Sequence, residues 1–243
     1  MKKILVMAAI LTLCATSAFA VVDTFSYGDG NLNGNGGWTG SDAGSIMVTG
    51  GKVKITSNAT DYTDANLAVA INPIEGLICV SFDYQMALAA PDNYFDIYVK
   101  DSAGKYLAWM YGRPEGYWDN GGVPTFAGGE MRGRGPDGVS YNYIAQGDYA
   151  WHHYCMLINT ATNYTSYYVD NVLIQVARQQ DGGVGDSVAT LQFRAYNKGH
   201  SGSWGYFDNL GAIGGNICVP EPGSILALLS GLVGIVGFAR KRR

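Results

Sequence analysis

The chain has 243 residues, of which 34 are Gly and 17 are Tyr, and only 15% of its residues are charged. This composition favours strands joined by tight turns and excludes an all-helical protein. Six of the 16 Lys and Arg residues but only one of the 20 Asp and Glu residues lie in the end segments 1–20 and 219–243, so the segment between them carries ten basic and 19 acidic residues. A surface of that sign repels phosphate, and we expect no nucleic-acid partner.

The N-terminal segment has the three parts of a secretory signal peptide. A pair of lysines precedes an apolar run at 4–13, and the small residues Ala18 and Ala20 mark a cleavage site after Ala20. Segment 1–20 is therefore expected to direct export. A single domain is expected at 21–218, because this length is too short for two sandwich domains.

Near the start of this domain, Asp29, Asn31 and Asn33 precede Gly34, as in the first half of a calcium-binding loop. Position twelve of the loop is Gly40, where such loops have a bidentate Glu. The pattern is therefore more typical of an Asn/Gly-rich turn, and the three residues are weak candidates for a metal site. A structural calcium ion elsewhere in the domain stays an open alternative.

Ten segments of the domain alternate apolar and polar residues and are separated by Gly, Asn and Asp, which is typical of antiparallel sheets. They lie at 45–49, 52–57, 76–86, 94–100, 105–111, 149–158, 164–168, 172–177, 189–196 and 204–213. Ten strands need two sheets, so the sequence predicts an all-β, two-sheet antiparallel sandwich.

The alternation also predicts the core. In segment 94–100, Phe95, Ile97 and Val99 share one face, and polar residues occupy the other. Applied to the other strands, the same rule predicts a buried set between the sheets: Val80, Phe82, Ile97, Val99, Trp151, Leu157, Val169, Leu191 and Phe193.

Short motifs in these strands resemble those of laminin-G-like and concanavalin-A-like domains. They are Asp-Tyr-Ala-Trp-His-His-Tyr at 148–154 and Tyr-Tyr-Val-Asp-Asn-Val-Leu at 167–173. Asp-Thr-Phe at 23–25 is similar to the first strand of such domains, and Gly-Tyr-Phe-Asp-Asn-Leu at 205–210 is similar to the last. The resemblance implies a jelly-roll topology in which the last strand returns beside the first.

A glycine-rich segment at 109–135 holds the best candidates for a glycan-binding surface. Aromatic faces stack on sugar rings, while charged groups bond hydroxyls. The candidates are Trp109, Tyr111, Arg113, Tyr117, Trp118 and Asp119. The alternative is that these aromatic residues form a small core of their own loop.

We expect no enzymatic activity. Endo-glucanases of the same fold carry a Glu-x-Asp-x-(x)-Glu strand that places two carboxylates on one face. The domain contains only Glu75, Glu115 and Glu130, and none has a carboxylate two residues later; Asp92, near Asp96, lies in a Pro-Asp-Asn turn. A divergent glycan hydrolase or lyase is the alternative.

The histidines and cysteines are interpreted as structural. Neighbouring strand residues point to opposite faces, so His152 and His153 do not readily bind one metal ion. By parity, Cys155 is expected on the core face, together with Trp151. Cys79 is expected on the polar face, which makes a bridge between the two cysteines doubtful. Cys218 is then free or pairs outside the domain.

The C-terminal segment 219–243 has three parts in a fixed order. Val219, Pro220, Glu221 and Pro222 form an extended stretch, because the two prolines exclude a helix. An apolar helix is expected at 223–239, about 25 Å long and just able to cross a membrane. The terminal cations Arg240, Lys241, Arg242 and Arg243 favour the cytoplasmic side, so the domain is expected outside.

This tail resembles the PEP-CTERM sorting signal of exported proteins in Gram-negative bacteria. The resemblance implies an inner-membrane precursor that an exosortase, a membrane-embedded protease, cuts near the motif at 219–222, with delivery to the cell surface or extracellular matrix. A plain single-pass anchor is the alternative. The sequence thus predicts an exported envelope protein whose non-catalytic domain binds polysaccharide or serves only as an adhesive matrix component.

Overall fold

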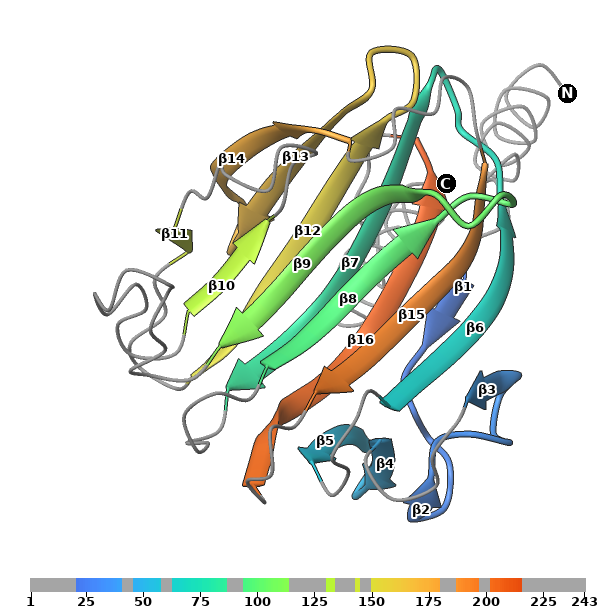
Figure 1. Ribbon diagram of the computed structural model, residues 1–243, viewed down its shortest axis with the longest axis vertical. Coiled ribbons are helices and arrows are strands. Elements are labelled where there is room, and N and C mark those ends of the chain that lie inside the picture. Colours follow the sequence, from blue (N-terminus) through green and yellow to red (C-terminus); the bar gives the residue numbers. More distant parts are fainter. Residues whose placement is uncertain are drawn as a thin grey trace, which may run out of the picture.

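The computed structural model describes residues 21–40, 46–57, 63–86, 94–113, 130–133, 143–144, 150–179, 187–196 and 202–215. Every regular element in these ranges is a β-strand, and the strands form two antiparallel sheets packed face to face (Figure 1). The all-β sandwich predicted from the sequence is confirmed. The expected signal peptide and membrane helix lie outside the described ranges, within which no helix is suited to span a membrane.

The first sheet, which we call the β7 sheet, has nine strands. In spatial order they are β14 (Val172–Arg178), β13 (Tyr164–Val169), β12 (Trp151–Asn159), β7 (Leu77–Met86), β16 (Gly202–Gly214), β5 (Lys52–Ser57), β4 (Ile46–Thr49) and β2 (Gly30–Asn31), with β1 (Val21–Asp23) also on β16. Asp23 lies opposite Leu210 in the β1–β16 pair, so the last strand returns beside the first, as the family resemblance implied.

The second sheet, the β8 sheet, has seven strands. Their order is β11 (Tyr143–Ile144), β10 (Glu130–Gly133), β9 (Tyr106–Arg113), β8 (Tyr94–Lys100), β15 (Val188–Tyr196), β6 (Thr63–Ile71) and β3 (Trp38–Gly40). All ten strands predicted from the sequence are present, with ends within two residues of those expected. The longest strand that the alternation did not predict is β6, whose inward residues include small Ala65 and polar Thr63 and so give a weak signal.

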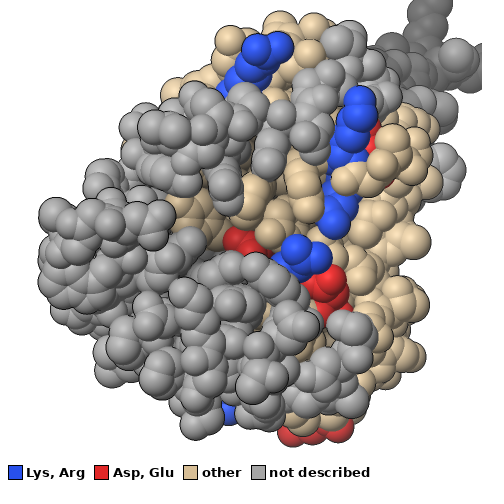
Figure 2. Space-filling model, in the orientation of Figure 1, with Lys and Arg blue, Asp and Glu red and all other residues tan. Residues whose placement is uncertain are grey.

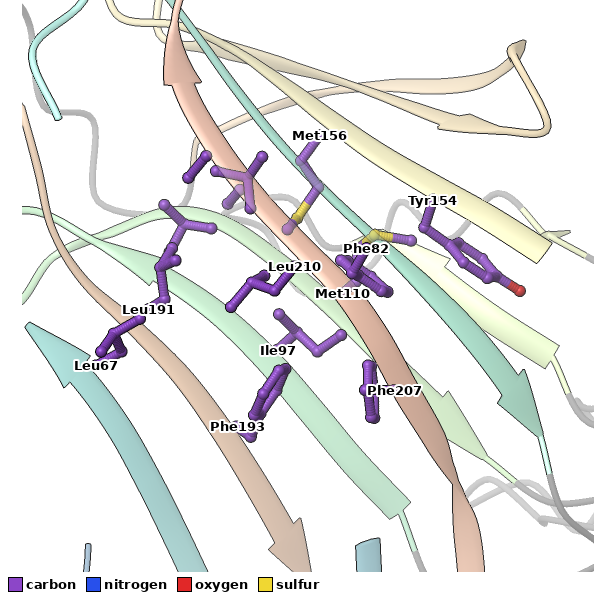
Figure 3. Close-up of a cluster of buried hydrophobic side chains, with 14 of the residues drawn as sticks. Leu67, Phe82, Ile97, Met110, Tyr154, Met156, Leu191, Phe193, Phe207 and Leu210 are labelled. Atoms are coloured by element: carbon purple, nitrogen blue, oxygen red, sulfur yellow. The ribbon is translucent and has the colours of Figure 1, made fainter. Parts of the chain in front are cut away.

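The core lies between the two sheets (Figure 3). Phe82 stacks on Tyr154 within the β7 sheet, and Phe193 of the β8 sheet meets Phe207 of β16 at 4.8 Å between ring centroids. Seven of the nine predicted core residues are buried, the exceptions being Trp151 and Leu157.

The prediction for Trp151 and Leu157 was wrong because β12 has apolar residues at both parities. Tyr154, Met156 and Ile158 are the residues that enter the core, so odd-numbered residues of this strand face outward and are only partly buried at 151 and 157.

The same error affected the cysteines. Cys155 is buried but lies on the outer face of the β7 sheet, not in the core. In register, Cys155 is opposite Ser81 and Leu157 is opposite Cys79, so both cysteines share one face of neighbouring strands. Their Sγ atoms face each other at 3.3 Å. The expectation that the two cysteines lie on different faces is therefore corrected.

Candidate functional site

The outer face of the β8 sheet carries three rows of polar and aromatic side chains across its central strands. The rows follow from the register of β6, β15, β8 and β9, whose inward residues alternate with these outward ones. We call the set the outer-face cluster: Lys100 and Tyr106 in the first row, Gln192, Tyr98 and Trp109 in the second, and Asp64, Arg194, Asp96 and Tyr111 in the third.

Four aromatic rings form the centre of the cluster. Tyr98 lies 4.9 Å from both Tyr106 and Trp109, measured between ring centroids. Trp109 is 5.8 Å from Tyr106 and 6.2 Å from Tyr111. These tilted contacts are within the range in which aromatic pairs attract each other, so the four rings support one another as a group.

Acidic and basic groups surround the rings, and most are paired. Arg194 binds Asp64 through two hydrogen bonds, from Nε to Oδ1 at 2.6 Å and from Nη2 to Oδ2 at 3.0 Å. The Trp109 indole N–H donates to Asp96 Oδ1 at 2.9 Å. The bond to Asp64 raises the pKa of Arg194, and burial together with the negative Asp96 raises that of Tyr98, so the guanidinium stays charged and the phenol neutral.

Lys100 is held differently. Its Nζ lies over the rings of Tyr98 and Tyr106, 5.3 and 5.0 Å from their centroids, and the Arg194 guanidinium is 5.4 Å from the Tyr98 centroid. Within the described part of the chain, no carboxylate forms an ion pair with the Lys100 ammonium. Burial and then the nearby Arg194 lower the pKa of Lys100, while Asp64 partly opposes them.

Burial divides the cluster into a buried part and a part that a ligand can reach, the reachable part. Asp96, Tyr98, Tyr111 and Gln192 are buried, and in the described structure the side-chain oxygen of Gln192 has no hydrogen-bond partner. The remaining members are partly exposed: Asp64, Lys100, Tyr106, Trp109 and Arg194. Figure 2 shows acidic and basic side chains next to one another near the middle of this face.

Strand β13 of the other sheet fixes the position of β9. Thr165 Oγ1 donates to the Leu107 carbonyl at 2.8 Å, and the backbone N–H of Trp109 donates to Tyr167 Oη at 3.3 Å. Thr165 and Tyr167 are both buried. The β8–β9 register shifts at Val99/Lys100, beside the part of β9 that these two residues contact. Trp109 is thus positioned from inside the sandwich.

The structure brings some of the sequence candidates for glycan binding together. Trp109 and Tyr111 both belong to the cluster, and Arg113 ends β9 in register with Glu130. Tyr117, Trp118 and Asp119 lie outside the described residues, so their role stays a prediction.

Sequence reasoning did not identify Lys100, Tyr106, Arg194 and Asp64 as site residues. A signal was present, since the polar face of 94–100 includes Lys100, but Arg194 and Asp64 are 130 residues apart and meet only through the β6–β15 pairing.

The weak metal candidates Asp29 and Asn31 accept hydrogen bonds from backbone N–H groups of turns. Asp29 Oδ1 accepts a hydrogen bond from the Gly50 N–H at 2.8 Å, and Asn31 Oδ1 accepts one from the Asn33 N–H at 3.2 Å. Across the described ranges, no three His, Cys, Asp or Glu side chains are grouped as metal ligands would be. These contacts match the Asn/Gly-rich turn that the sequence favoured.

The two adjacent histidines have separate acidic partners. His152 Nδ1 is 2.6 Å from Asp170 Oδ2, and His153 Nδ1 is 2.7 Å from Asp83 Oδ1. Asp83 also accepts a hydrogen bond from Asn209, and its pKa is lowered by these two partners although burial opposes the change. The separate partners agree with the expectation that neighbouring strand residues face opposite sides.

Comparison with known families decides the nature of the tail. Residues 219–243 match the family model described as the PEP-CTERM protein-sorting motif. The chain carries a PEP-CTERM sorting motif. The motif indicates an exported precursor that is anchored in a membrane. Among curated proteins, none matches the chain at a significant level.

Solved structures similar to this one are jelly-roll domains. The Emp47p carbohydrate recognition domain has a TM-score of 0.56 at 10% identity, covering 83% of this chain and 99% of that one. A Bacillus licheniformis β-glucanase has a TM-score of 0.51 at 12% identity, covering 81% and 98%. A sialidase has a TM-score of 0.60 at 14% identity, and this chain spans 82% of itself but only 19% of the sialidase. At these identities the similarity establishes the fold alone.

Proposed function

We propose that this protein is an exported cell-envelope or matrix protein, released from the inner membrane by an exosortase, whose outer-face cluster binds polysaccharide without cleaving it. The sorting motif supports the first part of the proposal. The second part rests mainly on one observation, which is that a partly exposed Trp109 lies among hydrogen-bonding groups at the centre of a sheet face.

The reachable part of the cluster has the composition of a sugar site. Trp109 and Tyr106 offer apolar ring surface that suits the C–H face of a sugar, while the Lys100 ammonium offers donors for the sugar's oxygen atoms. Because the rings support one another and β9 is held by β13, the surface is ordered before a ligand arrives, and this lowers the entropy cost of binding.

The acidic groups of the cluster favour binding over hydrolysis. A glycosidase needs one carboxylate as acid and a second as nucleophile or base. Both oxygens of Asp64 accept hydrogen bonds from Arg194, and Asp96 is buried with one oxygen bound to the Trp109 indole. Neither carboxylate is placed as an available partner for a scissile bond.

The proposal is tested by titrating the full chain, purified in detergent, with a panel of neutral and acidic polysaccharides in a calorimeter. We expect wild-type protein to bind at least one of them, and Trp109→Ala to weaken that binding about tenfold, or about 1.4 kcal/mol. Tyr106→Ala should act in the same direction. Tyr168→Ala is the matched control, because Tyr168 is also a partly exposed aromatic residue but belongs to the other sheet.

Circular dichroism melting of each variant separates lost binding from lost folding. Equal loss of affinity in Tyr168→Ala and Trp109→Ala would argue against the outer-face cluster as the binding surface. New reducing ends during incubation with the bound polysaccharide would support the divergent hydrolase instead, and binding to no member of the panel would leave a purely adhesive role.

A further inference from the structure

The two cations of the outer-face cluster differ in what they can still bind. Both oxygens of Asp64 are occupied by Arg194, so this pair is internally satisfied. Lys100 rests on the Tyr98 and Tyr106 rings and, among the described residues, has no carboxylate partner. An ammonium carries three N–H donors, and contact with ring faces gives none of them an oxygen or nitrogen acceptor.

The surroundings of Lys100 strengthen the attraction of its ammonium for an anion. The side chain is partly buried, and the like charge of Arg194 acts on it more strongly than the opposite charge of Asp64. A site of this kind carries local positive charge that water screens incompletely, so an added anion would gain more there than at an exposed lysine. The domain as a whole is acidic, so an anion would be attracted by a local positive charge such as this one and not by the charge of the domain.

The position of Lys100 also suggests what carries the anion. Lys100 is the register partner of Tyr106, and its ammonium lies over the partly exposed Tyr106 ring, whose centroid is 5.8 Å from that of the partly exposed Trp109. A sugar ring placed against these aromatic groups would bring a substituent of its own ring to the ammonium. A carboxylate on the sugar would form a charge-assisted hydrogen bond there, whereas a hydroxymethyl group would form only a neutral one.

We infer that the polysaccharide bound by the outer-face cluster is acidic, and that Lys100 holds the carboxylate of a uronic acid unit while Tyr106 and Trp109 contact its ring. The inference rests on the proposed function and specifies its ligand class. It concerns one carboxylate per site, not a basic groove for a polyanion.

The experiment compares polyuronates with their neutral derivatives. Polygalacturonate, polymannuronate and hyaluronan are each titrated into the full chain alongside the same polymer after its carboxylates have been reduced to alcohols. We expect at least one polyuronate to bind about tenfold more tightly than its reduced form. Lys100→Met should remove this preference, because methionine keeps the apolar stem without the charge, and affinity for the polyuronate should fall more than affinity for the reduced polymer.

Lys105→Met is the matched control, because Lys105 is an exposed lysine in the turn between β8 and β9 and should leave the preference intact. The inference is overturned if the reduced polymers bind as tightly as the polyuronates, if only neutral polysaccharides bind, or if Lys100→Met keeps the preference. In each of these cases polysaccharide binding itself survives. Absence of binding to every polysaccharide, neutral or acidic, would instead defeat the proposed function along with the inference.

Discussion

At the scale of single residues, Asp23 shows how one carboxylate organises the start of the domain. Its side chain is buried and accepts hydrogen bonds from the Phe25 N–H at 2.8 Å, the Tyr27 hydroxyl at 2.9 Å and the Trp38 indole at 2.8 Å. Burial and the bond to Asp23 raise the pKa of Tyr27 to about 12, so its hydroxyl remains a donor. Phe25, at a positive φ of 50°, and Trp38 then enter the core against Phe193.

We expect Asp23→Ala to lower the free energy of unfolding by about 3 kcal/mol, because three donors lose a charged acceptor and two of them belong to buried residues. Urea denaturation measures the change. Asp29→Ala is the control, since Asp29 accepts one exposed backbone N–H from Gly50 and its loss should cost less than about 1 kcal/mol. Equal stability of the two variants would contradict the role given to Asp23.

The scale of strands explains how a surface residue can depend on the interior. Thr165 and Tyr167 of β13 reach across the core to β9 on either side of Ala108. Gly133 of β10 packs against the same tyrosine so closely that an added Cβ would lie 2.7 Å from its ring. The backbone that carries Trp109 is thus fixed by the opposite sheet.

Thr165→Val and Tyr167→Phe should each destabilise the protein by about 1 kcal/mol, because each removes a hydrogen bond between a β13 side chain and a backbone group of β9. Both variants should also bind polysaccharide more weakly, because the backbone at Trp109 loses a restraint. Ser166→Ala, between the two on the outward side of β13, should change neither quantity. Calorimetry and urea denaturation report both effects, and unchanged affinity in Tyr167→Phe would show that the restraint does not matter for binding.

Strand-level patterns also set the limit of what the sequence could predict. The period of two located ten strands and correctly placed Ile97 and Val99 of β8 in the core, because the apolar residues of this strand occupy one parity only. It misassigned Trp151, Leu157 and Cys155 because both parities of β12 are apolar. The cluster around Trp109 needed the strand order as well, since β8 meets β15 and β15 meets β6 through connections that no local pattern encodes.

At the scale of the whole molecule, the charge distribution and the order of segments both indicate an exported, membrane-anchored precursor. The basic residues at the two ends flank an acidic middle, which fits a signal peptide at one end and a membrane-orienting cluster at the other. The sorting motif at 219–243 follows the sandwich directly, because the last strand ends at Gly214. Export of the domain depends on the signal peptide, but its release from the membrane to meet extracellular polysaccharide depends on processing at this tail, so the account of the whole molecule depends on the tail.

The most direct test is therefore mass spectrometry of the cell-associated and released protein. We predict that released wild-type protein ends near 219–222 and lacks Arg243. Changing Pro220, Glu221 and Pro222 to alanine should leave export intact but trap a full-length precursor in the membrane, whereas deleting 240–243 should disturb retention and orientation. Released wild-type protein that still carries Arg243, or a triple-alanine variant processed like wild type, would contradict the sorting account and leave an ordinary membrane anchor.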